Sequence, residues 1–281
     1  MQSYSQQGAH KAHSQHSVDG LPQSQSADML LHVRALTKAY RNTRNGLETW
    51  ALNGLELDVY RQEFISIMGP SGSGKTTLLN ILAGLDRPTS GELCLQGENM
   101  LALNADELAL FRRRNLGFVF QDFNLLDTLT LAENVALPLS LDKRGGGDIR
   151  QRVDEMLHFL SLGEQMQRYP YEVSGGQQQR TAVARALIHR PRLLLADEPT
   201  GNLDSASARA LLELFQQLNS QQQATILMVT HDPFSASYSQ RVVFIKDGRV
   251  FCQLQRSSSQ PQFFQSILDA LAHVEGGHEL A

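Results

Sequence analysis

The sequence predicts an α/β fold with a parallel central sheet, and three observations lead to it. Residues 69–77 form a glycine-rich turn between a short apolar run and an apolar helical segment, which is a strand–loop–helix arrangement. Apolar runs alternate with helical segments from Gln177 to Thr230, as in a layered α/β domain. Two of these runs, Leu193–Ala196 and Ile226–Val229, lack polar alternation, which is typical of central strands covered on both faces.

The composition limits the class of protein. The chain has 281 residues, enough for one large domain or two small ones, and its 41% hydrophobic content is ample for a core. A net charge of -4 gives no sign of nucleic-acid binding by bulk attraction. The sequence has no run of about 18 apolar residues and no apolar leader, so neither a membrane span nor a secretory signal is predicted. Cys94 and Cys252 match no metal or redox spacing, so we expect free thiols in a soluble cytoplasmic protein.

The first residues differ from the rest of the chain. Residues 1–29 are dominated by Gln, Ser and His, so a disordered polar tail is predicted. The spacing of His10, His13 and His16 leaves a metal site as an alternative, but no Cys or folded frame accompanies them. Strands are predicted after this tail at Leu31–Ala35, Trp50–Tyr60, Glu63–Met68, Gly91–Leu95, Leu193–Ala196, Thr225–Thr230 and Val243–Ile245, with a loop at Asn42–Gly46 and a turn at Asp247-Gly248.

Helical segments are predicted between and after these strands. They are Thr76–Leu85, Asp106–Arg114, Val153–Leu162, Gln177–His189 and Ala206–Leu218. The run Gly145-Gly146-Gly147 is interpreted as a linker inside a mostly helical region at 122–173. The chain ends with an apolar helix, and we expect one of its faces to pack on its own domain, with docking of a partner as the alternative. That face carries Phe264, Ile267, Leu268 and Leu271.

The glycine-rich turn meets the phosphate-loop pattern G-x-x-x-x-G-K-[ST] with Gly69, Gly74, Lys75 and Thr76. Glycines allow successive backbone N–H groups to point at the phosphates of a nucleotide. Lys75 adds a positive charge toward the outer phosphates, and the Thr76 hydroxyl is suited to bind Mg²⁺. The pattern therefore predicts nucleoside triphosphate binding by the whole loop, which comprises Gly69, Pro70, Ser71, Gly72, Ser73, Gly74, Lys75, Thr76 and Thr77.

Two carboxylates, Asp197 and Glu198, end the apolar strand that begins at Leu193. A strand delivers such groups rigidly to the sheet edge where the phosphate loop also lies. Asp197 is placed to hold Mg²⁺, directly or through water, and Glu198 to orient or deprotonate an attacking water. An ordinary acidic strand end before Pro199 is the alternative, and the neighbouring phosphate loop argues against it.

Three further positions are candidates for the same site. Ser174-Gly175-Gly176-Gln177 is a glycine-containing turn that opens a helix, where free N–H groups and a hydroxyl suit an anion; a plain helix cap is the alternative. Gln121 closes an apolar stretch, and its neutral amide is able to contact both a metal and a nucleophilic water. His231 also closes an apolar stretch and is able to reach a terminal phosphate, although a histidine at a strand end is more often structural.

Together these motifs resemble the nucleotide-binding domain of ABC ATPases, in the family's order, over about residues 30–250. The Ser-Gly-Gly-Gln turn separates this family from other P-loop proteins. The resemblance implies a P-loop NTPase core with a parallel central sheet, an antiparallel β subdomain and a helical subdomain at about 122–173. It implies three parts: a polar tail (1–29), a nucleotide-binding domain (30–255), and a C-terminal helix and tail (256–281). The matching residues are Gly69–Thr77, Gln121, Ser174–Gln177, Asp197-Glu198, Asn202-Leu203-Asp204 and His231.

The resemblance also implies a function. It indicates an ATPase with ATP and Mg²⁺ as cofactors that forms a head-to-tail dimer, in which Lys75 and Thr76 of one copy face Ser174–Gly176 of the other. Tyr40 is similar to the family's aromatic residue that stacks on adenine, with surface packing as the alternative, and Asp204 is similar to the dimer-contact acid. The implied partner is an integral-membrane permease and not a nucleic acid. The expected location is peripheral, on the cytoplasmic face of the cell membrane.

Several segments bear on the branch of the family. Residues 117–130, Asp86–Gly91 and the helix at Phe263–Gln265 resemble bacitracin-resistance-type ATPases, which serve antimicrobial-peptide exporters or detoxifiers. Asn202–Ser205 is equally similar to lipoprotein-releasing, macrolide-exporting and cell-division ATPases. We favour an ATPase for a permease that removes peptide antibiotics or frees their lipid targets. The alternative is a regulatory ATPase that transmits a signal and transports nothing. Apolar residues at Phe123–Leu131 are expected to dock the permease, unless they belong to the core.

Overall fold

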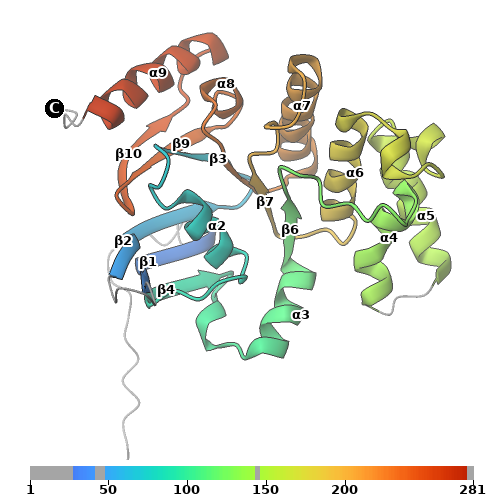
Figure 1. Cartoon of the computed structure of the whole chain (residues 1–281), viewed down its shortest axis with the longest axis horizontal. Helices are drawn as coiled ribbons and strands as arrows, with labels where there is room; N and C mark the ends of the chain where they lie inside the picture. Colours follow the sequence, from blue (N-terminus) through green and yellow to red (C-terminus); the bar gives the residue numbers. More distant parts are fainter. Residues whose placement is uncertain (1–27, 42–47, 143–145, 277–281) are drawn as a thin grey trace, which may run out of the picture.

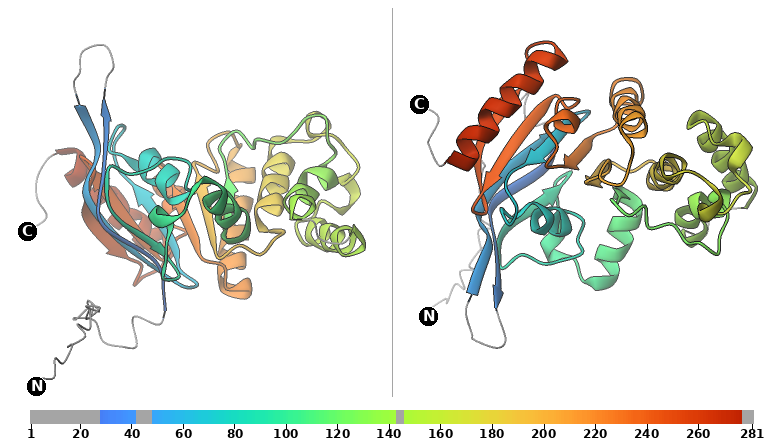
Figure 2. Two further views of the ribbon diagram at one scale, coloured as in Figure 1. Left: turned by 90° about the horizontal axis from the view of Figure 1, so that it is seen from below. Right: turned by 45° about the horizontal axis from the view of Figure 1, so that its top comes forward.

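The computed structural model describes residues 28–41, 48–142 and 146–276. The two β-sheets occupy one end and the middle of the molecule, and a group of helices lies at the other end (Figures 1 and 2). In this part of the chain, no helix is both long and apolar enough to cross a lipid bilayer. The tail at 1–27 and the loop expected at Asn42–Gly46 lie outside the described residues.

The larger sheet has six strands in the order β10-β9-β3-β8-β7-β6, and every neighbouring pair is parallel except β10 with β9. The predicted parallel central sheet is therefore confirmed. Its strands are β3 (Phe64–Met68), β6 (Leu116–Val119), β7 (Leu193–Asp197), β8 (Ile226–Val229), β9 (Arg241–Lys246) and β10 (Arg249–Gln255).

The smaller sheet is antiparallel, with the order β2-β1-β4-β5. It packs beside helix α2 (Lys75–Leu82) and one face of the larger sheet (Figure 1). It is the antiparallel β subdomain that the resemblance implied. Its strands are β1 (Met29–Arg41), β2 (Glu48–Tyr60), β4 (Ser90–Leu95) and β5 (Glu98–Asn99).

Helices cover both faces of the larger sheet, and side chains alternate between the two faces along each strand. In β8, Leu227 and Val229 pack in the cluster that contains α2 and the small sheet, whereas Ile226 and Met228 pack in the cluster that contains α4 to α7. The helices are α2 (Lys75–Leu82), α3 (Ala105–Asn115), α4 (Leu131–Leu141), α5 (Gly146–Phe159), α6 (Gly175–Leu187), α7 (Ser205–Gln222), α8 (Pro233–Ala236) and α9 (Gln260–Gly276), with short 3₁₀ turns at Met100–Ala102, Gly163–Gln165 and Pro170–Glu172.

Local side chains fix where several of these helices begin. The side chains of Asn104, Thr130 and Ser174 each accept a hydrogen bond from the backbone N–H of the residue three positions later. The Glu or Gln side chain at that later position accepts a hydrogen bond from the backbone N–H of the first residue. Asp204 caps α7 by accepting from the N–H groups of Ala206 and Ser207. Such caps satisfy N–H groups that have no partner inside the helix, and each stabilises it by about 1 kcal/mol.

The structure corrects three expectations about individual elements. Of the expected linker Gly145-Gly146-Gly147, the last two residues begin α5, and Gly145 lies outside the described residues. Residues 249–255 form strand β10, which the sequence analysis did not predict. The buried face of α9 is centred on Phe263, Ile267, Ala270 and Val274, whereas Leu268 is 36% exposed. Helix α9 packs on β9 and β10, so the expectation that it covers its own domain is confirmed.

Candidate functional site

The predicted functional residues follow neighbouring parallel strands at the point where each strand ends. The glycine-rich turn 69–77 follows β3, His231 follows β8, Asp197 ends β7, and Gln121 follows β6. The strands β3, β8, β7 and β6 are adjacent and parallel, so their carboxyl ends lie along the same sheet edge. The fold therefore brings these side chains to one edge, which is where α/β proteins bind ligands.

Two glycines in the turn are required by close backbone approaches. Gly69 has φ of 150° and Gly74 has φ of 104°. A side chain at Gly69 would overlap the carbonyl oxygen of Ile245, and one at Gly74 would overlap that of Ala51. The turn is therefore held tightly against β9 and β2, and glycine is the residue that allows both the conformation and the approach.

Lys75 starts α2, and its ammonium group donates hydrogen bonds of 2.8 Å to the carbonyls of Gly69 and Pro70. Burial lowers the pKa of Lys75, and the negative charges of Glu198 and Asp197 oppose that shift. The lysine is half-buried within the turn, in the position expected for a group that contacts phosphates.

The two carboxylates have different surroundings. Burial raises the pKa of Asp197, the charge of Glu198 raises it further, and Lys75 lowers it. Glu198 is mostly buried, at 19% exposed, and its Oε1 lies 2.9 Å from Nδ1 of His231, which is 76% exposed. Glu198 also has φ of 46°, a left-handed conformation held by its N–H, which donates to Val229 at 2.9 Å. The structure thus pairs the predicted base with the predicted histidine.

Gln121 is tied to the segment that follows Glu198. Its Nε2 lies 3.4 Å from Oδ1 of Asn202, and the Asn202 amide donates to the carbonyl of Gln121 at 3.2 Å and to Asp122 at 2.8 Å. Gly201 allows the two segments to touch, since a side chain there would lie 2.9 Å from the Gln121 amide. Asn202 is a bridging residue that the sequence analysis included only through the family motif.

The Ser174–Gln177 turn lies apart from the phosphate turn in the same chain. Helix α6, which it opens, is on the far side of β6 and β7 from α2 (Figures 1 and 2). Ser174 is exposed, and its hydroxyl accepts from the N–H of Gln177 at 3.3 Å. Gly176 packs against α7, where an added Cβ would lie 2.7 Å from the Ser207 hydroxyl. One chain therefore brings the predicted nucleotide-binding residues together in two separate groups.

Tyr40 lies near the end of β1 with 44% of its surface exposed. Its hydroxyl donates to Asp86 at 2.8 Å, and the ammonium of Lys38 lies 4.8 Å from the ring centre. Burial raises the pKa of Asp86, but hydrogen bonds from Lys38 and Tyr40 outweigh it and leave the pKa below its usual value. The ring is thus fixed at one edge and accessible, an arrangement that fits both stacking on a base and plain surface packing.

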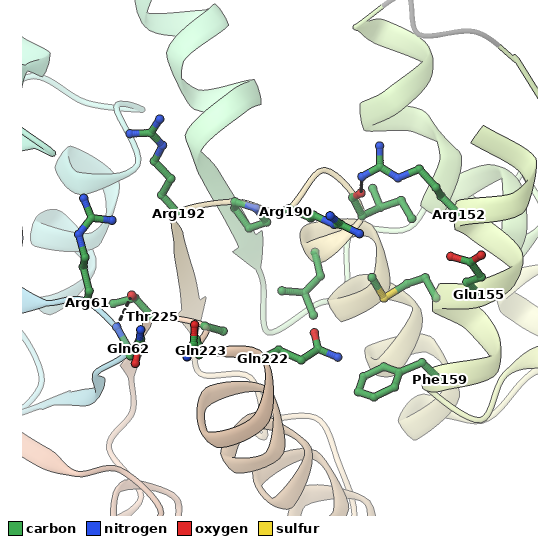
Figure 3. Close-up of a pocket in the computed structure, with 15 residues that line it drawn as sticks. Arg61, Gln62, Arg152, Glu155, Phe159, Arg190, Arg192, Gln222, Gln223 and Thr225 are labelled. Atoms are coloured by element: carbon green, nitrogen blue, oxygen red, sulfur yellow. Dashed lines mark hydrogen bonds between the residues drawn. The ribbon is translucent and has the colours of Figure 1, made fainter. Parts of the chain in front are cut away.

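A cavity of about 850 Å³ lies beside Glu198 and His231, between the segment 200–203, α7 and α8. A second cavity, of about 740 Å³, lies at the opposite edge of the sheet and contains Arg61, Arg152, Arg190 and Arg192 (Figure 3). Helices α6 and α7 end there, and Arg152 donates to the carbonyl of Ile188 at 3.0 Å. Cations at helix C-termini offset the partial negative charge of the last carbonyls. A structural role at the end of α6 therefore explains Arg152.

Comparisons with known proteins agree with this geometry. Residues 52–201 match the family model described as ABC transporter. The chain is 53% identical over 247 residues to the uncharacterized ABC transporter ATP-binding protein YvcR of Bacillus subtilis, covering 88% of this chain and 95% of that protein. It is 47% identical over 253 residues to the bacitracin export ATP-binding protein BceA of Halalkalibacterium halodurans, covering 89% and 99%. Among solved structures, the ATP-binding cassette MJ0796 of Methanocaldococcus jannaschii, a dimer bound to ADP and Pi, superposes with a TM-score of 0.74 at 40% identity and covers 82% of this chain and 100% of that one.

Proposed function

This chain belongs to the ABC transporter family of ATP-binding proteins, and we propose that it hydrolyses ATP to drive a membrane permease that protects cells against antimicrobial peptides. The observation that carries the ATPase part is the convergence of the phosphate turn, Asp197-Glu198, Gln121 and His231 at one edge of the larger sheet. The antimicrobial part rests on 47% identity to a bacitracin export ATP-binding protein, over 99% of the length of that relative.

The roles of the site residues follow from their positions. The backbone of 69–77, together with Lys75, would hold the phosphates, and Tyr40 would stack on the adenine. Glu198 would accept a proton from the attacking water, since its carboxylate is rigidly held at the strand end by His231 and the bond from its N–H to Val229. His231 would then face the terminal phosphate, and Gln121 would orient the water.

The residues present fit a magnesium ion bound together with the nucleotide. Thr76, Gln121 and Asp197 offer a hydroxyl, an amide oxygen and a carboxylate, which are oxygen donors of the kind that Mg²⁺ prefers. The described residues include no cluster of three or more His, Cys, Asp or Glu side chains that could hold a metal alone. Mg²⁺ usually takes one or two carboxylates plus substrate phosphates, so a single Asp197 is sufficient. When bound, the ion would neutralise charge on the outer phosphates.

The separation of the two groups of nucleotide-binding residues supports a head-to-tail dimer. Ser174–Gly176 are unable to reach the phosphate turn of their own chain, because β6 and β7 lie between α6 and α2 (Figure 1). In a two-fold dimer, this exposed turn would close over the nucleotide held by the partner. ATP would then join the two copies, and its hydrolysis would release them.

A groove of about 470 Å³ is the proposed docking place for the permease. It lies between α3, β6, α4 and α6 and adjoins the segment that carries Gln121, so an occupant would act on that segment directly. Within Phe123–Leu131, Leu131 is fully buried and belongs to the core, whereas Leu126 is 49% exposed. The groove is lined by Phe118, Phe120, Asn124, Leu137, Pro138 and Leu141 together with Ala109, Arg112, Arg113, Leu116, Arg185, Ala186 and His189.

Two substitutions test the docking role. Leu141 is 61% exposed within the groove, so Leu141→Glu should weaken co-purification with the permease and leave basal ATPase activity unchanged. Leu268→Glu is the matched control, because Leu268 is an exposed leucine on α9, away from the groove. Unchanged co-purification and unchanged permease stimulation for Leu141→Glu would exclude this groove.

The identity of the permease tests the transport part. The tagged chain would be purified from detergent-solubilised native membranes, which also tests its peripheral location, and the spans of the co-purifying protein would be counted. A ten-span permease with a large extracellular domain would support antimicrobial-peptide resistance. A four-span partner would favour the lipoprotein, macrolide or cell-division branches, the last of which transmit signals without transport. Recovery of no membrane protein would reject the transport role and leave only the ATPase.

A further inference from the structure

Gln179 lies in the second turn of α6 and is fully buried, with 0% of its surface exposed. Its side-chain nitrogen donates to two backbone carbonyls, 2.6 Å to that of Pro199 and 3.3 Å to that of Phe120. These acceptors are 20 and 59 residues away in the sequence. Pro199 directly follows Glu198, and Phe120 directly precedes Gln121. One buried amide therefore joins α6 to both loops that carry the proposed catalytic groups.

The chemistry of the position requires an amide donor. A primary amide has two N–H bonds, and both neighbours of Gln179 are carbonyl oxygens, so the nitrogen must face them. Its own oxygen, Oε1, is then buried without a hydrogen-bond partner among the described residues. Leucine or methionine would remove this unpartnered acceptor, but it would also take a donor away from the carbonyls of Pro199 and Phe120, and the loss of a buried hydrogen bond costs free energy. What glutamine supplies, and leucine or methionine does not, is the pair of donors.

The two loops that Gln179 joins need external support. Glu198 is a non-glycine residue with φ of 46° that precedes a proline, and this is a disfavoured conformation. Backbone strain of this kind persists only where the surrounding structure holds it. Asn202 ties the same two loops together at the surface, through Gln121 and Asp122. Gln179 supplies the corresponding tie in the interior.

We propose that Gln179 is a positioning residue for ATP hydrolysis, which fixes the loops of Glu198 and Gln121 relative to each other and to the start of α6. It is fully buried and acts through the two loops. The inference rests on the proposed roles of Glu198 and Gln121. Because Ser174–Gly176 begin the same helix, Gln179 also couples the orientation of that turn to the catalytic loops.

The first test replaces the donors and keeps the volume. Gln179→Leu and Gln179→Met should lower kcat by about 10- to 100-fold, since a misplacement of about 1 Å at a reacting group costs up to 100-fold. KM and the affinity for ATP should stay within about threefold, because the phosphate turn is untouched. Gln216→Leu is the matched control: Gln216 also lies in a helix and donates to a distant carbonyl, that of Tyr238 at 3.0 Å, and its loss should leave kcat unchanged.

The second test distinguishes positioning from general destabilisation. In a Glu198→Gln background, Gln179→Leu should lower the residual rate by less than about threefold, because residues that act as a unit are not additive. A full second loss in that background would assign Gln179 an independent role and overturn the inference. So would a folded Gln179→Leu protein with wild-type kcat. Failure of both Gln179 variants to fold would assign a purely structural role. Absence of ATPase activity in the unmodified chain would instead reject the proposed function.

Discussion

Replacement of Glu198 by glutamine is the most informative single change. Glutamine has the same shape, and its amide oxygen is able to keep the contact that Oε1 makes with His231 at 2.9 Å. The second oxygen of Glu198 accepts from the backbone nitrogen of His231 at 3.4 Å, and an amide in its place would lose at most this long contact. The fold should therefore be preserved, with a change in the free energy of unfolding below about 1 kcal/mol.

The effect on catalysis should be much larger than the effect on stability. A positioned general base contributes about 100- to 10,000-fold, so Glu198→Gln should raise the activation free energy by roughly 3 to 5.5 kcal/mol. Phosphate release at saturating ATP measures the rate, and light scattering with ATP present should detect a stable dimer. Glu213→Gln is the control, because Glu213 lines the same cavity from α7 and should be dispensable. More than about a tenth of wild-type turnover in Glu198→Gln would refute the assignment of the base.

Three further outcomes are expected. Lys75→Ala should weaken ATP binding by about 10- to 100-fold in a titration calorimeter, since a hydrogen bond to a charged group contributes about 1.5–3 kcal/mol; unchanged affinity would place the phosphates elsewhere. Ile267→Ala should lower the free energy of unfolding in urea by about 2–5 kcal/mol because Ile267 is 0% exposed, whereas Leu268→Ala, at 36% exposed, should cost less; equal costs would contradict the packing of α9. Burial raises the pKa of Asp58, but bonds from Arg34 and His32 outweigh it and hold the pKa below its usual value. Asp58 therefore stabilises the fold above about pH 4, and this contribution is lost as the pH falls through its lowered pKa, so stability should fall less on acidification in Asp58→Asn than in the wild type.

Much of the core could be predicted because its signals are local. The strand–loop–helix at the phosphate turn and the unbroken apolar runs of β7 and β8 are read directly from neighbouring residues. The helix starts at Asn104 and Asp204 likewise follow from side chains within three residues. Residues close together in the sequence determine these elements, so they can be predicted without knowledge of the tertiary packing.

Other features depend on tertiary packing and could not be read from the sequence. The buried face of α9 includes the expected Ile267, but it runs through Phe263 and Ala270 instead of Phe264 and Leu268, because contact with β9 and β10 selects the face. Strand β10 is half-buried, and its extended conformation depends on antiparallel pairing with β9. The ties made by Asn202 and Gln179 join segments up to 81 residues apart. No sequence pattern near either residue indicates its partners.

The central claim, that two copies share each ATP site, is tested most directly by mixing two inactive variants. Lys75→Ala disables the phosphate turn and Ser174→Arg disables the α6 turn, so each protein alone should show almost no ATPase activity. In a head-to-tail dimer, one site of each mixed pair combines an intact phosphate turn with an intact α6 turn. Equal mixing should then restore up to about a quarter of the wild-type rate, because about half of the dimers are mixed and each has one of two sites intact. A mixture that stays as inactive as its components would contradict the shared site.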